Sequence, residues 1–368
     1  MAITGTNGKT TVSNTIADIL EATGRKVLSN RAGSNMWSGI ATTLLAGCTL
    51  SGKLREGYDT AVLEVDERSS SRIYPYVQPD VLVVTNLYRD SIKRNGHSEF
   101  IFDKIAQALP AETHLLLNGD DMISGLLGEG RNERVFFRVA KTDRSTDTCV
   151  NTACDCSACP RCGHLLAFGY FHYHHIGRAH CPECGFTLPE ATYEAVDTDF
   201  EAGSFMLREP GQANLRLPCK QGSLFSVYNI TAAVGCCRML GLAGADIARA
   251  LEGPSERTGR FEQQKAGAVN IVTMLRNAGA TEVHVRISSP PFKFPCYFGT
   301  DIPSGDQLIA NHHTIDEIRQ LLGADSLGYL DCDRMNEMVK DLEYCDACFT
   351  GNYPVDPPTR DIRGDMEV

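Results

Sequence analysis

The chain opens with a glycine-rich segment whose residue types suit a phosphate-binding loop. The residues TGTNGKTT place Gly5, Gly8, Lys9 and Thr10 before an amphipathic stretch. Glycines let backbone N–H groups turn towards phosphate oxygens, a lysine reaches the outer phosphates, and the hydroxyl after it can bind Mg²⁺. The segment departs from the general GxxxxGK(S/T) pattern because Ile3 stands where the first glycine is expected. We interpret it as an ATP-binding loop; the alternative is a glycine-rich turn before a helix.

Two matching cysteine pairs indicate a metal site. They lie in CPRCGH and CPECGF, which supply Cys159, Cys162, Cys181 and Cys184. Four thiolates suit a closed tetrahedral Zn²⁺ site, and the length between the pairs fits a zinc ribbon. We therefore expect bound zinc with a structural role; the alternative is four free thiols. Because four Cys complete the coordination, the histidines between the pairs are expected to be exposed or stacking residues and not ligands: His172, His174, His175 and His180.

Buried strands alternating with helices must position these groups. The residues after the loop, TVSNTIADILEATG, predict a helix with one apolar stripe that ends at Gly24. The run Thr60–Val65 and the segments PDVLVVTNLYRD and ETHLLLNGDD each contain a continuous apolar stretch typical of a buried strand, and FIFDKIAQAL between the last two is helical in pattern. This alternation predicts an α/β fold with a parallel sheet.

Polar side chains follow these strands, at the edge where open α/β sheets bind ligands. They are Glu64, Asp66 and Glu67 after the first strand, Asn86 after the second, and Asn118, Asp120 and Asp121 after the third. Mg²⁺ usually takes one or two carboxylates together with phosphate oxygens. The first group therefore predicts a magnesium ligand beside the loop; the alternative is a solvated acidic turn.

Composition narrows the class of protein. A length of 368 residues predicts two or three domains, and 42% hydrophobic with 22% charged residues is globular. The net charge of −11 argues against a broad nucleic-acid or anionic-membrane surface. We find neither a long apolar span nor a signal peptide and expect a cytoplasmic protein. In such a chain, clustered cysteines favour metal over disulfides.

Five motifs, in this order, resemble the central ATPase domain of the Mur ligases: GTNGKTT, NRAGSNMWSGIATTLL, AVLEVDE, VVTNLYRD and LNGDD. The similarity covers residues 1–262 and is nearest to the MurT type, the synthetase subunit of lipid II isoglutaminyl synthases. The resemblance implies ATP and Mg²⁺ as cofactors and a Cys₄ ribbon inserted in the ATPase domain. It also implies a GatD-type glutaminase as partner and lipid II, a substrate at the membrane surface, with no nucleic acid bound.

The same resemblance assigns roles to matching residues. The expected nucleotide-binding set is Gly5, Thr6, Asn7, Gly8, Lys9, Thr10, Thr11, Asn86 and Asn229. Asn229, in the buried helix FSVYNITAAVGCCRMLG, would approach the base. Thr10 and Glu64 are expected to bind Mg²⁺, and Glu64 and Arg260 to be catalytic. Arg260, in ERTGRFEQ, would offset charge growing on the transferred phosphoryl group, unless this segment is a solvated charged turn.

A second resemblance begins beyond Glu262. The segments IVTMLRNAGATEVHVRISSPPFKFPCYFGTDIP, LGADSLGYLDCDRM and YCDACFTGNYP resemble the C-terminal part of glutamine amidophosphoribosyltransferases over residues 271–357. Residues 263–270, QQKAGAVN, replace that family's phosphoribosyl pyrophosphate loop, so we expect no phosphoribosyl transfer. Cys296, Cys345 and Cys348 match three of four Fe–S ligands, and a full cluster is not expected. The strand expected at EVHVRI would lack its sheet, and proteolysis should cut first between about residues 263 and 285.

These similarities predict four segments. Residues 1–145 and 191–262 would form the ATPase domain, residues 146–190 the zinc ribbon, and residues 263–368 the amidophosphoribosyltransferase-like fragment. We expect the chain to lack the segment before the loop and the third ligase domain, as a gene fusion or as two joined gene fragments. Three functions compete: a MurT-like amide ligase impaired by the missing domain, a non-catalytic nucleotide- and zinc-binding fragment, and a remnant of the purine-synthesis amidophosphoribosyltransferase.

Overall fold

The computed structural model divides the chain into two compact units, residues 1–255 and 256–368. The residues that it describes are 1–31, 35–49, 53, 55–88, 98–149, 156–219, 223–252, 272, 276, 279–295, 308–338 and 345–354. Arg260, Cys296 and the expected cleavage region up to residue 271 lie outside this set. The boundaries predicted at residues 145/146, 190/191 and 262/263 stay predictions.

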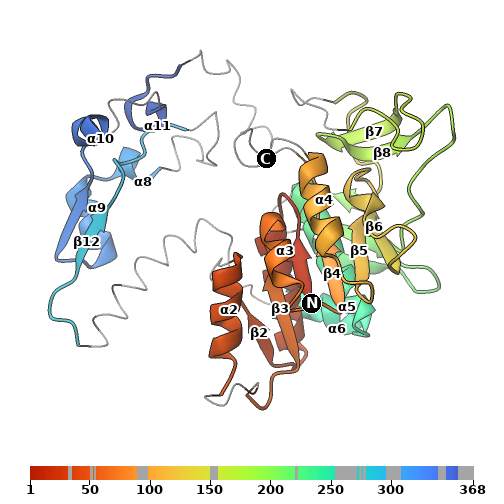
Figure 1. Cartoon of the computed structure of the whole chain (residues 1–368), viewed down its shortest axis with the longest axis horizontal. Coiled ribbons are helices and arrows are strands. Elements are labelled where there is room, and N and C mark those ends of the chain that lie inside the picture. Colours follow the sequence, from red (N-terminus) through yellow and green to blue (C-terminus); the bar gives the residue numbers. More distant parts are fainter. Residues whose placement is uncertain are drawn as a thin grey trace. The chain divides into compact units, whose positions relative to one another are not determined.

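A large, mostly parallel sheet forms the centre of the first unit (Figure 1). Its strand order among the described residues is β11-β10-β9-β6-β5-β4-β1-β3-β2. The pairs from β2 to β9 are parallel, whereas β9, β10 and β11 pair antiparallel at one edge. The strands are β1 Ala2–Thr4, β2 Val27–Ser29, β3 Thr60–Glu64, β4 Val81–Val84, β5 His114–Asn118, β6 Arg134–Val139, β9 Tyr193–Asp199, β10 Ser204–Arg208 and β11 Leu215–Pro218. The predicted parallel α/β fold is therefore confirmed.

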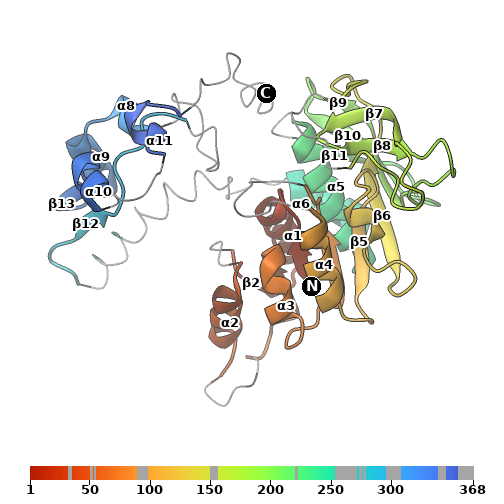
Figure 2. The ribbon, with the colours of Figure 1, turned by 45° about the horizontal axis from the view of Figure 1, so that its top comes forward.

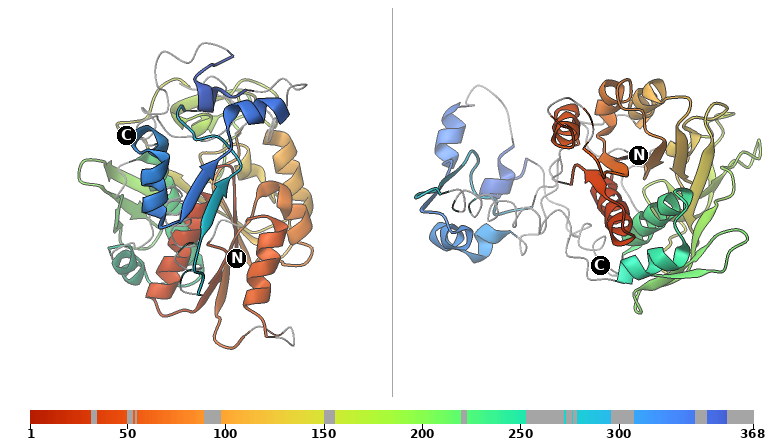
Figure 3. Two further views of the ribbon diagram at one scale, coloured as in Figure 1. Left: turned by 90° about the vertical axis from the view of Figure 1, so that its left-hand side faces the viewer. Right: turned by 90° about the horizontal axis from the view of Figure 1, so that it is seen from below.

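Helices cover both faces of this sheet, because its central strands are apolar on both sides. One core joins α1, α5 and α6 to side chains such as Ile3 and Val83, and the other joins α2, α3 and α4 to Leu82 and Val84. Figures 2 and 3 show the two helical layers. The helices are α1 Lys9–Ala22, α2 Trp37–Ala46, α3 Ser70–Ile73, α4 Ser98–Ala108, α5 Leu224–Met239 and α6 Gly244–Glu252, with short 3₁₀ turns η1 Glu67–Ser69 and η2 Ser124–Leu126.

The helix after the phosphate loop forms as its apolar spacing predicts. Val12, Ile16, Ile19 and Leu20 of α1 are buried against the sheet and α5. The helix ends before Gly24, which has a φ of 88°, a left-handed conformation that glycine adopts without steric cost. The stripe thus anchors α1 so that its first turn stays at the end of β1.

The cysteine-bearing insertion is built on an antiparallel hairpin of β7 Ala167–Tyr173 and β8 Ile176–His180 (Figure 1). Cys162 precedes β7 by a short segment, and Cys181 follows β8 directly. The hairpin turn, at His174 and His175, lies at the opposite end from the four cysteines because both strands run the length of the hairpin. The insertion therefore has a cysteine end and a tip.

The second unit contains a two-stranded parallel sheet of β12 His284–Ile287 and β13 Ser326–Tyr329 (Figure 3). The expectation that the EVHVRI strand lacks a partner is therefore wrong. Helix α9, Ile315–Leu322, precedes β13 and begins with a capping box between Thr314 and Glu317. The remaining helices of this unit are α8 Ile309–His312, α10 Cys332–Met338 and α11 Ala347–Thr350. Among the described residues of the whole chain, no helix has the length and apolarity to cross a membrane.

Candidate functional site

The glycine-rich loop connects β1 to α1 at the carboxyl end of the sheet. Gly5 and Gly8 have φ values of 128° and 83°, which other residues rarely adopt. A Cβ atom at Gly5 would also lie 2.2 Å from Thr85 Oγ1. The loop opens into the first turn of α1, where the N–H groups of Lys9, Thr10 and Thr11 have no acceptor within the helix. Free donors at a helix N-terminus fit a phosphate group.

The end of β4 holds the loop through its backbone. Thr6 N donates to Asn86 O at 2.8 Å, and Asn7 N donates to Asn86 Oδ1 at 3.0 Å. Thr85 Oγ1 donates to Asn7 O at 2.6 Å. Asn86 was predicted to bind nucleotide, and in this structure its amide oxygen supports the loop.

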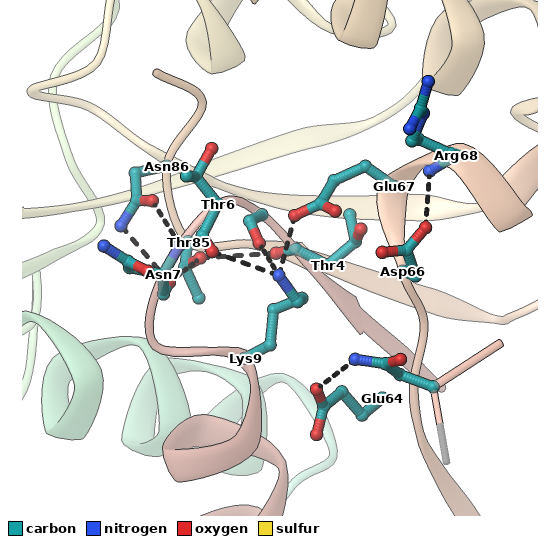
Figure 4. Close-up of polar contacts among 12 residues, drawn as sticks. Thr4, Thr6, Asn7, Lys9, Glu64, Asp66, Glu67, Arg68, Thr85 and Asn86 are labelled. Atoms are coloured by element: carbon teal, nitrogen blue, oxygen red, sulfur yellow. Dashed lines mark hydrogen bonds and ion pairs between the residues drawn. The ribbon is translucent and has the colours of Figure 1, made fainter. Parts of the chain in front are cut away.

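Lys9 lies between the loop and a buried carboxylate. Its Nζ donates to Thr6 O at 3.1 Å and to Gly5 O, and it forms an ion pair with Glu67 Oε1 at 2.8 Å (Figure 4). The Glu67 side chain is only 3% exposed. Burial raises the pKa of Glu67, and the Lys9 ammonium opposes that shift. The sequence placed Glu67 among the acidic residues after β3, but it did not predict that Glu67 would pair with the loop lysine.

Glu64 is fixed on two sides by asparagines. Asn35 Nδ2 donates to Glu64 Oε1 at 2.8 Å, and Asn30 exchanges hydrogen bonds with the Glu64 backbone at 2.8 Å each. Glu64 is 2% exposed. Thr10 is partly exposed, and Thr11 is exposed, in the first turn of α1. A carboxylate and a hydroxyl beside a phosphate loop are the oxygen ligands that Mg²⁺ uses, so the residues fit the predicted ion.

Helix α5 closes the loop from its other side. A Cβ atom at Gly8 would lie 2.2 Å from Asn229 Oδ1, so this asparagine packs directly on the loop. Asn229 was predicted near the nucleotide base, and the structure places it against Gly8. The requirement for glycine at this position therefore has two causes, the positive φ and the asparagine.

Two aspartates after β5 face inward. Asp120 Oδ2 accepts from Val139 N at 2.9 Å and from Tyr228 OH at 2.7 Å, and burial raises the pKa of Asp120 to about 6. Asp121 Oδ1 pairs with His175 Nε2 at 2.9 Å, with both side chains fully buried. The Asp120 carboxylate therefore links β6 to α5, and the Asp121 carboxylate links the end of β5 to the inserted hairpin.

The four histidines of the insertion differ in burial. His175 is fully buried, so the expectation of an exposed or stacking residue is wrong for it. His172 is 7% exposed, bonds Tyr228 OH through Nδ1 at 2.6 Å, and has its pKa lowered by burial to about 3. His174 stacks on Tyr88, and His180 is exposed, as expected. The buried pair of His175 and Asp121 was not predicted, because its two members lie on different elements.

The four cysteines form two copies of one knuckle. In each copy the glycine N–H donates to the first cysteine's carbonyl, Gly163 to Cys159 at 2.9 Å and Gly185 to Cys181 at 3.0 Å. Across the copies, Cys159 Sγ lies 3.6 Å from Cys184 Sγ, and Cys162 Sγ lies 3.5 Å from Cys181 Sγ. All four sulfurs lie within 4.8 Å of one another. A tetrahedron of zinc–sulfur bonds near 2.3 Å has edges of about 3.8 Å, so the donor set fits one Zn²⁺.

The chain is similar to known proteins over most of its length. Residues 3–151 match the family model described as the Mur ligase middle domain. This match assigns residues 3–151, and not the whole chain, to the Mur ligase middle domain family. The chain is 31% identical over 274 residues to the MurT subunit of lipid II isoglutaminyl synthase (glutamine-hydrolyzing) from Staphylococcus aureus strain COL, covering 73% of this chain and 60% of that protein. The MurT subunit of Streptococcus pneumoniae is 29% identical over 302 residues, covering 80% of this chain and 65% of that protein.

The Mur ligase fold extends to solved structures. A pseudomurein peptide ligase type C from Methanothermus fervidus superposes with a TM-score of 0.56 at 19% identity, covering 93% of this chain and 78% of that one. This likeness shows the fold alone. The chain spans about 60% of the length of the S. aureus MurT subunit.

The C-terminal region has a different relative. An amidophosphoribosyltransferase from Pyrococcus horikoshii is 54% identical over 85 residues, which cover 23% of this chain and 19% of that enzyme. The two predicted similarities, to MurT subunits and to amidophosphoribosyltransferases, are therefore confirmed. Cys345 and Cys348, the described members of the expected Fe–S set, lie in this region, whereas Cys296 lies outside the described residues.

Proposed function

We propose that this protein is a MurT-like, ATP-dependent amide ligase subunit that activates the α-carboxylate of the D-glutamate in lipid II for amidation to D-isoglutamine. The observation that carries the proposal is the 31% identity to a MurT subunit across 274 residues. The loop that it includes has a geometry suited to a nucleotide. The proposal extends the activity of those relatives to this chain.

The chemistry follows from the poor reactivity of a carboxylate. A carboxylate oxygen attacks the γ-phosphorus of ATP, the bond to the β,γ-bridging oxygen breaks, and an acyl phosphate and ADP result. Ammonia, supplied by a GatD-type glutaminase, then attacks the acyl carbon, loses a proton and expels inorganic phosphate. In this proposal Lys9 leaves Glu67 to bind the outer phosphates, and the helix α1 N–H groups bind phosphate oxygens.

Metal ions have separate roles in the proposal. Thr10 and Glu64 would hold Mg²⁺, which neutralises phosphate charge. Cys159, Cys162, Cys181 and Cys184 would hold Zn²⁺, and because four thiolates leave no open position, that ion is structural. Arg260 remains a predicted catalytic residue outside the described set.

Reconstitution tests this function. The full chain would be mixed with a GatD-type glutaminase, glutamine, Mg²⁺-ATP and lipid II, with ADP release and the mass of lipid II as readouts. We expect ADP release that depends on lipid II, because the acyl phosphate forms only when a carboxylate substrate is present to attack ATP. Absence of ATP binding would contradict the proposal at its first step.

The second candidate is a nucleotide- and zinc-binding module without ligase activity. The feature that favours it is the similarity of the C-terminal region to a different enzyme, an amidophosphoribosyltransferase. Tight ATP binding with no ADP release in any combination of glutaminase and lipid II would support this candidate over the first.

A further inference from the structure

The tip of the β7–β8 hairpin lies against the segment that follows β4. His175 Nε2 bonds Asp121 Oδ1 at 2.9 Å, and neither side chain has any exposed surface. The next contact is between rings, since His174 stacks on Tyr88 with centroids 4.3 Å apart and planes at 20°. Tyr173 meets the same Tyr88 ring edge-on at 6.2 Å. His175 therefore contacts Asp121, which follows β5, whereas Tyr173 and His174 directly contact the segment that follows β4.

Asp121 links the hairpin tip to the backbone of that segment. Its Oδ2 accepts from Leu87 N at 2.7 Å, while Oδ1 also accepts from Ile123 N at 2.9 Å. The hydrogen bonds from His175 and Leu87 lower the pKa of Asp121, against the opposing effect of burial. A buried carboxylate with these donors holds its position, because loss of one donor leaves a desolvated oxygen.

Tyr88 in turn holds the phosphate loop. Tyr88 N donates to Thr6 Oγ1 at 3.1 Å, and Thr6 Oγ1 donates to Tyr88 O at 3.1 Å. Asn7 Nδ2 donates to the Tyr88 hydroxyl. A displacement of Tyr88 therefore moves both Thr6 and Asn7, the residues at the turn of the loop.

The backbone at the tip also carries strain. His174 has a φ of 46°, a left-handed conformation that is unfavourable for a non-glycine residue. Such conformations persist where surrounding contacts hold them, and one contact of this side chain is the stack on Tyr88. The strained residue therefore lies where the insertion contacts Tyr88, the residue that bonds the phosphate loop.

We propose that the hairpin tip, Tyr173–His175, positions the phosphate loop through Asp121 and Tyr88, so that the cysteine-bearing insertion is part of the nucleotide site. This inference rests on the proposed binding of ATP at the loop. His174 and His175 act as positioning residues through Tyr88 and Asp121, respectively. Because Cys162 and Cys181 adjoin the other end of the same hairpin, metal bound there fixes the strands that carry the tip.

The test measures affinity for two ligands in the full chain. His174→Asn removes the ring but keeps a residue that tolerates the left-handed conformation. Dissociation constants would be measured for Mg²⁺-ATP by calorimetry and for Mg²⁺-tripolyphosphate by displacement of bound ATP. We expect both to rise three- to tenfold, because the loop contacts the phosphates that the two ligands share. The metal content and the melting temperature should not change.

Two further variants make the result specific. His180→Asn is the matched control, since His180 is an exposed histidine on the same hairpin and its loss should leave both constants unchanged. Tyr88→Phe keeps the ring and removes the hydroxyl that accepts from Asn7, so it should weaken both ligands as well. If His174→Asn lowers the melting temperature, Tyr88→Phe still tests whether Tyr88 positions the loop.

Three outcomes would overturn the inference. Unchanged constants in both His174→Asn and Tyr88→Phe would separate the insertion from the loop. Weaker ATP binding with unchanged tripolyphosphate binding would mean that the tip contacts the base and not the loop. Equal weakening by His180→Asn would show a general effect of the hairpin. Failure of the wild-type chain to bind ATP would instead reject the proposed function, which keeps the two tests distinguishable.

Discussion

At the scale of single residues, Lys9 is held by its surroundings before any nucleotide arrives. The ion pair with Glu67, 2.8 Å long, and the loop carbonyls occupy its ammonium. Nucleotide phosphates therefore compete with a buried carboxylate for this cation. Glu67 becomes a second residue through which the affinity of the loop can be altered.

Replacement of Lys9 tests the loop directly. We expect Lys9→Ala to weaken ATP binding at least tenfold, about 1.4 kcal/mol, because the cation for the outer phosphates is lost. Calorimetry of the purified variant measures the change. Lys26→Ala is the matched control, as Lys26 is exposed beyond the far end of α1. Equal ATP affinity in Lys9→Ala and wild type would contradict the assignment of the loop.

Asp120 predicts a pH dependence of stability. Burial raises its pKa from 3.8 to about 6, so the folded state binds this proton more tightly than the unfolded state. The stabilisation is complete below about pH 4 and is lost as the pH rises through 6. Asp120→Asn cannot titrate, and its free energy of unfolding relative to wild type should therefore increase by about 2–3 kcal/mol between pH 4 and pH 7.

Urea unfolding at several pH values measures this difference. His172 titrates in the opposite sense, since burial lowers its pKa to about 3, but it is present in both proteins and cancels in the comparison. Asp147→Asn serves as the control because the Asp147 side chain is 88% exposed. A difference between Asp120→Asn and wild type that stays constant over this pH range would count against a raised pKa.

At the scale of elements, the Cys₄ insertion combines two knuckles and a hairpin. The knuckles repeat the same backbone bonds, and their sulfurs lie at the separations of a tetrahedral site. The hairpin between them reaches the core through buried histidines. A metal in the knuckles would therefore stabilise an element that is already tied to the ATPase sheet at its other end.

Metal analysis tests the knuckles. We expect one zinc per chain at this site and its loss in Cys162→Ser, since removal of one thiolate breaks the closed coordination; structural zinc contributes on the order of 10 kcal/mol in small modules. Emission spectrometry of the dialysed protein gives the ratio. Cys156→Ser should keep its zinc, because Cys156 stands outside the four clustered thiols. Zinc retained in Cys162→Ser would reject this ligand set.

At the scale of the whole molecule, the two units differ in how deeply their strands are buried. Every residue of β4 is buried, whereas β12 and β13 contain no fully buried residue. Two-stranded sheets are marginally stable, while a central parallel strand covered on both faces is well protected. The described sheet of the second unit should therefore open at a lower free energy than that of the first.

Hydrogen exchange measures the relative free energies of local opening of the two sheets. Amides of β12 and β13 should exchange at least a hundredfold faster than those of β4 and β5 in the full chain, because fewer apolar contacts oppose local opening. The edge strand β2 of the first unit is a useful reference, since among the described strands it pairs with β3 alone. Protection of β12 equal to that of β4 would mean that the second unit is as stable as the first.

The sequence alone determined the features that depend on neighbouring residues. The glycines of the loop, the stripe of α1 and the paired CxxC knuckles are local, since each requires a backbone angle or a spacing within a few positions. Apolar runs likewise predicted β3, β4 and β5, because strands buried on both faces need continuous apolar side chains. The second unit was less predictable, as the pairing of β12 with β13 shows.

Only the tertiary structure decided which distant groups meet. Lys9 and Glu67 are 58 positions apart, His175 and Asp121 are 54 apart, and Thr6 and Tyr88 are 82 apart. A residue type shows that a side chain needs a partner when buried, but it does not show which partner. The order of the strands and the fold of the hairpin bring these pairs together, and this is the physical reason that the link between insertion and loop could not be predicted from sequence.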